Sequence, residues 1–290
     1  MPSAPATFRF LVAESEPPEA REERRKSVGR SSGETYLDIL ERLAPGASCH
    51  RIGPADANAS LQDGTSLADY DGVFLTGSPM HLYEETPETR RIVAFMRAVF
   101  VSGTPSFGSC AGLQVATVAA GGSVRRIAGG YEAAFARRIV PTEAGRGHPL
   151  LAGRPDSYDA PTIHSDEVET LPEGAVRLAG NRVTSVQAAE IRYGGGVFWG
   201  VQYHPEIGLD EVAGALRRQS ESLVEVGLSG SEDEVDAYAD QIEALHREPG
   251  RRDIAWRLGL DGEVIDETRR LTELRNFIDH LTGLREGRAA

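Results

Sequence analysis

The chain begins with an alternation of short apolar runs and longer stretches in which apolar residues recur at helical spacing. Two runs, FRFLVA at 8–13 and VFL at 73–75, have the length and residue types of buried strands. Apolar residues recur every three or four positions over 36–43, 86–101 and 113–120, which predicts three helices. This order predicts an α/β fold, in which helices flank a mostly parallel central sheet.

The pattern changes after residue 122. Short alternating runs divided by Gly, Pro and Asp predict antiparallel additions to the sheet, at 135–140, 176–178, 185–191 and 197–201. From residue 209 onward the pattern is helical and highly charged, with an apolar face near the C-terminus made by Leu271, Leu274, Phe277, Ile278 and Leu281. We therefore expect a main domain over 1–208 and a helical extension over 209–290. The extension is too polar for a strong core of its own, so we expect it to pack on the main domain or on a partner.

One segment of the main domain lacks any apolar pattern. Residues 14–33 are dense in charge and contain two prolines. We expect a long exposed loop here, either a solvated surface segment or a mobile lid over a site. A helix is predicted to start at Ser32, because Ser31 and Glu34 have the spacing of a capping box.

Composition narrows the class of protein. The chain has 290 residues, is 40% hydrophobic, and carries 31 Lys and Arg against 44 Asp and Glu, a net charge of −13. This acidic balance argues against binding to nucleic acid or to a membrane surface, and no apolar run approaches the ~20 residues of a membrane span. The two cysteines are too few for a disulfide scaffold, and the first residues lack a signal-peptide pattern, so we expect a cytoplasmic protein.

Cys110 lies where a nucleophile would be expected. It falls between a predicted strand and a predicted helix, with Gly108 and Gly112 on either side. Small neighbours permit the sharp turn that exposes a nucleophile, and a helix N-terminus favours the thiolate form of cysteine. Taken alone, this pattern is also compatible with a buried structural cysteine.

A second short motif supplies the groups that a cysteine nucleophile needs. The apolar run at 197–201 leads into Gln202-Tyr203-His204-Pro205-Glu206. His204 can act as the base, and Glu206 can fix the tautomer of its ring. Alone, His-Pro-Glu is also typical of a surface turn. The motif indicates catalysis only in combination with Cys110.

Together these motifs resemble those of class I glutamine amidotransferases. Gly108-Ser109-Cys110-Ala111-Gly112-Leu113-Gln114 is similar to the nucleophile motif of that family, and His204 follows Cys110 after 94 residues, a separation that also fits. The segment at 75–79 resembles the glycine-rich oxyanion strand, and 163–168 is similar to a region of the GMP-synthase-like branch. The resemblance covers about residues 7–207 and implies a flavodoxin-like three-layer fold.

The resemblance also implies a mechanism. Cys110 would attack the side-chain amide of glutamine, and the backbone N–H groups of Gly77 and Ala111 would hold the oxyanion. His204, oriented by Glu206, would protonate the departing ammonia, and hydrolysis of the γ-glutamyl thioester would release glutamate. We expect no metal ion and no cofactor.

Other residues near the motifs have weaker roles in this picture. Gln114 is implied to contact the substrate, and so is His164, with Asp166 nearby, although a hydrogen-bonded structural histidine fits equally well. Ala111 and Leu113 stand where many relatives carry larger residues or histidine. We therefore expect a wider pocket beside the nucleophile.

Several functions remain open at this level. The first is a glutamine amidotransferase or glutaminase, which would need a separate synthetase chain as ammonia acceptor, because the sequence has no GxxxxGK[ST] loop and no pyrophosphatase motif. The second is a γ-glutamyl hydrolase that uses the same three residues on a larger leaving amine. A non-catalytic module with the same fold, and a more distant Cys-His enzyme of the elbow type, complete the alternatives. The acceptor and the oligomeric state, a homo-oligomer included, cannot be inferred.

Overall fold

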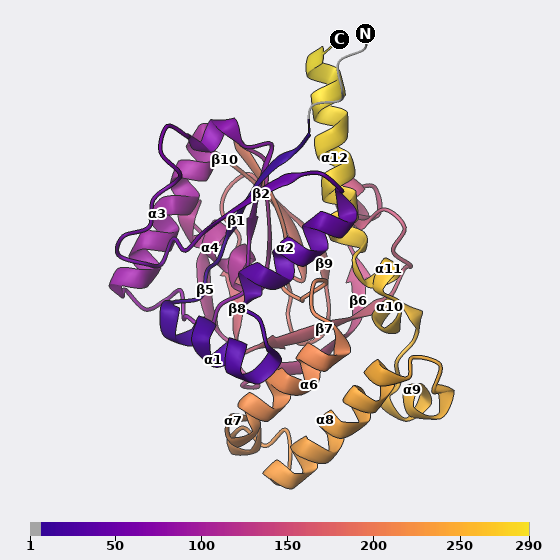
Figure 1. Ribbon diagram of the computed structural model, residues 1–290. Helices are drawn as coiled ribbons and strands as arrows, with labels where there is room; N and C mark the ends of the chain where they lie inside the picture. Colours follow the sequence, from indigo (N-terminus) through magenta and orange to yellow (C-terminus); the bar gives the residue numbers. More distant parts are fainter. Residues whose placement is uncertain (1–6, 290) are drawn as a thin grey trace.

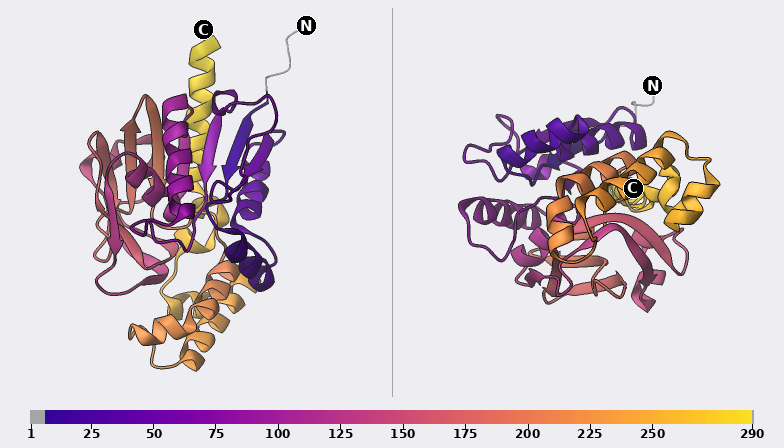
Figure 2. Two further views of the ribbon diagram at one scale, coloured as in Figure 1. Left: turned by 90° about the vertical axis from the view of Figure 1, so that its left-hand side faces the viewer. Right: turned by 90° about the horizontal axis from the view of Figure 1, so that it is seen from below.

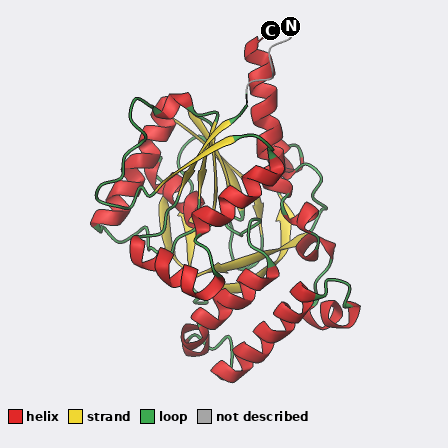
Figure 3. Ribbon diagram, viewed as in Figure 1, coloured by secondary structure: helices red, strands yellow, loops and turns green. Residues whose placement is uncertain are grey.

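A nine-stranded sheet with helices on both faces forms the centre of the computed structural model, which describes residues 7–289 (Figures 1 and 3). The sheet order is β2 (Ser48–Ile52), β1 (Arg9–Ala13), β3 (Gly72–Leu75), β4 (Ser106–Ser109), β11 (Gly196–Val201), β10 (Ala188–Tyr193), β9 (Ala175–Gly180), β6 (Glu132–Pro141) and β7 (Tyr158–His164). The first five strands pair in parallel and the last four are joined by antiparallel pairings. β5 (Ser123–Arg126) and β8 (Asp166–Thr170) form a separate antiparallel pair. The predicted α/β fold and its antiparallel additions are confirmed, and the additions make the sheet mixed.

The two faces of the sheet bury different side chains because successive strand residues point to opposite sides. Phe10 and Val12 of β1 pack with α2 (Ser32–Leu43), while Leu11 and Ala13 pack with α3 (Pro87–Ser102) and α4 (Ala111–Ala119). α2 begins where its capping box predicts, since the Ser31 and Glu34 side chains each bond to the other's backbone N–H.

The C-terminal helix α12 (Thr272–Ala289) lies in the main core. Its apolar face packs beside α2 on the same side of the sheet, and the ring centroid of Phe277 lies 5.4 Å from that of Phe74 and 5.8 Å from that of Trp199. The helix runs along the sheet and ends at the side of the molecule where β1 begins (Figure 1). Part of the C-terminal extension therefore completes the main three-layer core.

Beyond the clusters on the two faces of the sheet, helices that follow β11 form a further apolar cluster with β6, below the sheet in the left view of Figure 2. These helices are α6 (Leu209–Arg218), α7 (Ser220–Glu225), α8 (Glu232–Arg247), α9 (Arg252–Leu258) and α10 (Gly262–Ile265); α11 (Glu267–Arg270) links them to α12. Shorter elements are α5 (Glu143–Arg146) and two 3-10 turns, Leu67–Asp69 and Pro149–Leu151. A division of the chain at 208/209 stays a prediction. No helix in the described part of the chain is both long and apolar enough to cross a membrane.

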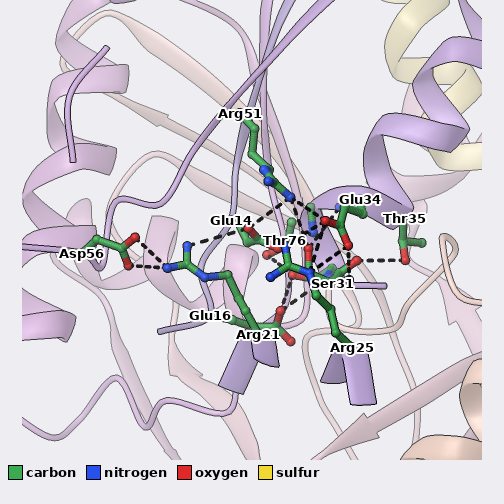
Figure 4. A network of polar contacts seen from close by, with 12 residues as sticks. Glu14, Glu16, Arg21, Arg25, Ser31, Glu34, Thr35, Arg51, Asp56 and Thr76 are labelled. Atoms are coloured by element: carbon green, nitrogen blue, oxygen red, sulfur yellow. Dashed lines mark hydrogen bonds and ion pairs between the residues drawn. The ribbon is translucent and has the colours of Figure 1, made fainter. Parts of the chain in front are cut away.

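The expectation of a loop over residues 14–33 is wrong. Pro18–Val28 form helix α1, and Glu14 and Glu16 are buried. No residue of α1 is buried, so its sequence lacks the apolar period that would have revealed a helix. Ion pairs hold it instead: Arg21 pairs with Asp56, two atoms 2.6 Å apart (Figure 4).

Candidate active site

Cys110 lies at a sharp turn between β4 and α4. Its φ of 51° and ψ of −112° are a strained combination for a side chain with a Cβ, and its backbone N–H donates to the carbonyl of Val201, at 2.8 Å. A Cβ on Gly112 would lie 2.8 Å from the Leu75 carbonyl oxygen, so only glycine fits there. The sequence around Cys110 therefore forms the predicted elbow, with the sulfur at the start of a helix.

His204 and Glu206 follow the end of β11, the strand that lies beside β4. The pairing of Val201 with Ser109 brings the two strand ends together, and with them both motifs. The Nδ1 atom of His204 lies 2.7 Å from Oε1 of Glu206, and the ring lies beside Cys110, with which it lines the same cavity. Sheet register therefore joins groups that are 94 residues apart in the sequence.

The charge on His204 follows from these neighbours. Burial alone disfavours the imidazolium and lowers the pKa of His204, but the neighbouring Glu206 and Cys110 outweigh burial and raise this pKa to about 10. The three side chains thus form a buried row with the protonated ring of His204 in the middle.

Gly77 and Ala111 flank the same point. Gly77 follows β3, and a Cβ added to it would lie 2.8 Å from Cε1 of His204 and 3.7 Å from Cβ of Cys110. Ala111 is the first residue of α4, where backbone N–H groups have no partner within the helix. That the backbone N–H groups of Gly77 and Ala111 form an oxyanion hole stays a prediction.

A cavity of about 370 Å³ opens over Cys110. Its lining includes Gly77, Gln114, His164 and His204, so the structure brings these predicted site residues together with Cys110. Glu206 is not among the described residues that line it.

Two predicted side chains do not widen the cavity. Ala111 and Leu113 are buried and are missing from the described lining, so their size does not set the room beside the nucleophile. The space comes instead from Ala20 of α1 and from Ile207 and Ala215, beside and on α6.

Gln114 and His164 are both tied to neighbouring groups. The Gln114 amide donates to the Asp166 carbonyl, at 3.0 Å, and to Oε1 of Gln202, at 3.2 Å. His164 bonds through Nδ1 to the same carbonyl, at 2.8 Å, and through Nε2 to Glu132, at 3.1 Å. Because both ring nitrogens of His164 have partners, the structure favours its interpretation as a hydrogen-bonded structural residue.

Sequence reasoning missed a further histidine. His81 lines the cavity, and its Nδ1 lies 2.7 Å from Oδ2 of Asp166. It follows Gly77 by four residues in the turn after β3. The sequence signal for His81 is its position two residues after the segment at 75–79, which resembles the oxyanion strand.

The other missed wall is made by α1 and α6. Glu16 and Arg24 line the cavity from the α1 side and Glu211 from α6, and Arg24 pairs with both carboxylates. No sequence motif indicates this wall, because the contact of Arg24 with Glu211 joins positions 187 residues apart. Figure 4 shows Glu16 within the wider polar network around α1.

The arrangement has the parts that acyl transfer to a thiol requires. It combines a sulfur that faces a cavity from a helix N-terminus, a buried imidazole held by a carboxylate, and room for a substrate.

Known proteins resemble this chain in sequence and in fold. The family model of class I glutamine amidotransferases matches residues 46–219. A γ-glutamyl-L-1-hydroxyisopropylamide hydrolase from Pseudomonas sp. is 36% identical over 94% of this chain and 93% of its own length. A glutamine-hydrolysing GMP synthase subunit from Methanoculleus marisnigri is 40% identical over 36% of this chain and 53% of its own.

Solved structures extend the likeness of fold to the C-terminal helices. A glutamine amidotransferase from Thermotoga maritima matches with a TM-score of 0.60 at 21% identity, over 95% of this chain and 98% of that one. A glutamine amidotransferase from Methylobacillus flagellatus matches with a TM-score of 0.57 at 17% identity, over 94% of both chains.

Proposed function

The chain belongs to the class I glutamine amidotransferase family, and from this premise we propose that it hydrolyses the side-chain amide of glutamine through a γ-glutamyl thioester on Cys110. The products are glutamate and ammonia, and the ammonia passes to a separate acceptor enzyme. The contact of His204 with both Cys110 and Glu206 at the floor of the cavity is the observation that carries the proposal.

The first half of the reaction forms the thioester. The Cys110 thiolate attacks the carboxamide carbon, and the carbonyl oxygen becomes an oxyanion that the N–H groups of Gly77 and Ala111 hold. As this intermediate collapses, the C–N bond breaks and His204 gives its proton to the departing nitrogen. Glu206 keeps the ring oriented throughout.

The second half releases glutamate. His204, now neutral, takes a proton from a water molecule, and the hydroxide attacks the thioester carbonyl. The C–S bond breaks, the thiolate of Cys110 returns, and the protonated ring of His204 restores the starting state.

A second candidate function keeps this chemistry and changes the leaving amine. The Pseudomonas relative is named for cleaving γ-glutamyl-L-1-hydroxyisopropylamide, and the similarity runs through the C-terminal helices as well. Ile207 and Ala215, which follow His204 in the chain, also line the cavity, and we place the substituent of the leaving amine against them. We propose γ-glutamyl amides of small amines as alternative substrates.

The test is release of glutamate by the purified chain. L-Glutamine, γ-glutamyl-hydroxyisopropylamide and γ-glutamyl dipeptides would each be offered at several concentrations. Cys110→Ala serves as the control, and circular dichroism checks that its fold is intact. We expect this variant to lose at least ~10³-fold in kcat, because no other group forms the thioester.

The comparison of substrates separates the two candidates. Faster release from glutamine supports the amidotransferase, whereas faster release from substituted amides supports the γ-glutamyl hydrolase. Undiminished turnover by Cys110→Ala would overturn both.

A further inference from the structure

A buried polar chain continues behind Glu206, away from the cavity. The Ser109 side chain lies 2.8 Å from Oε1 of Glu206, and the Tyr36 hydroxyl lies 2.8 Å from Oγ of Ser109. Ser109 and Tyr36 are both fully buried. Tyr36 comes from α2 and Ser109 from the last position of β4, directly before Cys110.

The direction of the protons in this chain is fixed by chemistry. A carboxylate only accepts hydrogen bonds, so the hydroxyl of Ser109 donates its one hydrogen bond to Glu206. Tyr36 must then donate to Ser109. Burial, followed by the charges of Glu206 and Cys110, raises the pKa of Tyr36 well above its ordinary value, so its hydroxyl keeps the proton that this donation needs.

The other oxygen of Glu206 explains why the hydrogen bond from Ser109 matters for the charge of this carboxylate. Oε2 is buried and has no hydrogen-bond partner within the described residues, while Oε1 accepts from both His204 and Ser109. A buried carboxylate with one unpartnered oxygen is costly to keep charged. Ser109 is the donor that offsets this cost from outside the Cys110–His204 pair.

We propose that Ser109 and Tyr36 are positioning residues that hold Glu206 charged and turned toward His204, an assignment that rests on the proposed role of the Cys110–His204 pair. Among the described residues, His204 on its own segment and Tyr36 on α2 interact with Glu206, and Cys110 at the start of α4 acts on both of them. Tyr36 and Ser109 are neutral and are missing from the described lining of the cavity. They act through the carboxylate.

The effect has a definite sign. Hydrogen bonds to the charged form of a carboxyl favour ionisation, so removing the Ser109 hydroxyl makes Glu206 easier to protonate. The thiolate–imidazolium pair then loses its support at a higher pH than in the wild type. The rate of Cys110 alkylation falls off on the acidic side of its pH profile, which we call the acid limb. This limb is expected to move to higher pH.

The experiment measures alkylation of Cys110 by iodoacetamide between pH 4 and 9, quantified on the Cys110 peptide by mass spectrometry. For Ser109→Ala we expect the acid limb to rise by about one pH unit, the size expected when a charged group loses one hydrogen bond. Tyr36→Phe is expected to shift it the same way by less, and Ser109→Thr to restore much of the wild-type profile. On whichever substrate is turned over, kcat falls about tenfold at neutral pH while KM changes little.

The matched control is Thr117→Val, which removes a buried hydroxyl from α4 that bonds only to the Leu113 carbonyl in the described structure. It leaves the acid limb in place. If Ser109→Ala and Tyr36→Phe lower the melting temperature but leave the acid limb where it is, their role is packing and the proposal is overturned. Should Ser109→Ala not fold, Tyr36→Phe decides alone. Alkylation needs no substrate, so a wrong proposed function would leave this test intact.

Discussion

The cavity over Cys110 has two walls that are built in different ways. One wall comes from the ends of β3, β4 and β11, and its side chains are fixed by sheet register, in which Gly200 lies opposite Gly108. The other comes from α1 and α6, where Arg24 bridges Glu16 and Glu211. Backbone hydrogen bonds hold the first wall. In the second, α6 packs through apolar residues, and ion pairs between side chains tie α1 to it.

The difference suggests a division of labour. A strand end cannot move without disturbing the sheet, so the first wall suits groups whose geometry must be exact, such as Cys110 and His204. A helix held by ion pairs can change its surface residues while the sheet stays as it is. The α1–α6 wall is therefore where the room for the leaving amine can vary without loss of the chemistry.

Glu206→Gln breaks the first wall with the largest expected effect. Glutamine keeps the shape but loses the charge, and its amide can donate to Nδ1 of His204 and so favour the wrong tautomer. We expect kcat to fall roughly 10³–10⁴-fold, as for other triads that lose this carboxylate. The measurement is steady-state kinetics on the better substrate.

The same variant tests the charge on His204. In the wild type the charged ring contributes stability that is fully present below its ordinary pKa of 6.5 and is lost as pH rises through about 10. Glutamine in place of Glu206 removes the larger of the two charges that raise the pKa of His204, so this pKa falls. The pH above which His204 loses its proton is then lower than in the wild type, and an NMR titration of His204 measures this change. A kcat within tenfold of the wild type would contradict the role of the carboxylate.

The first wall is also the one that the sequence predicts well. Short apolar runs and helical spacing locate β1, β3, α3 and α4 within a few residues, and Gly-x-Cys-x-Gly marks the elbow at Cys110. These signals are local, because glycine spacing and apolar period report on the chain within a few residues. Only the meeting of Cys110 with His204 needs the sheet, and the motif order supplies that.

The second wall is predicted less well, for a physical reason. α1 buries no residue, so its sequence lacks an apolar period, although Pro18 at its start, Gly29 at its end and charges that suit each end are signals of a helix. Its stability depends on partners that lie far away in the chain, such as Glu211. The contact of Ser109 with Glu206 escaped prediction in the same way, because it joins side chains 97 residues apart.

Glu211→Gln tests how strongly the second wall depends on its ion pairs. Glu211 is 2% exposed and accepts from Arg24, Arg30 and Thr35. Its loss leaves Arg24, only 16% exposed, with Glu16 as its remaining anionic neighbour, at 3.7 Å. We expect the free energy of unfolding to fall by about 3 kcal/mol, measured by urea denaturation.

The control is an exposed ion pair within α1, the helix that carries Arg24. Glu22 pairs with Arg25 while its side chain remains 62% exposed, so Glu22→Gln should leave the urea midpoint almost unchanged. Equal losses in the two variants would mean that burial does not distinguish these pairs. The second wall would then not rest on Glu211.

Ala215→Leu gives the smallest effect and the sharpest comparison between the walls. Ala215 lines the cavity from α6, and a larger side chain there takes space from the leaving amine while Cys110, His204 and Glu206 stay in place. For a γ-glutamyl hydroxyalkylamide we expect kcat/KM to fall roughly 10–100-fold, the range in which one or two methylene groups discriminate in a pocket. For glutamine, which releases only ammonia, the change should stay within a few-fold. Ala20→Leu repeats the test from α1, and Ala237→Leu, on the exposed side of α8, is the control. An equal loss on both substrates would show that α6 supports the chemistry as well as the room for the amine, and the two walls would no longer have separate tasks.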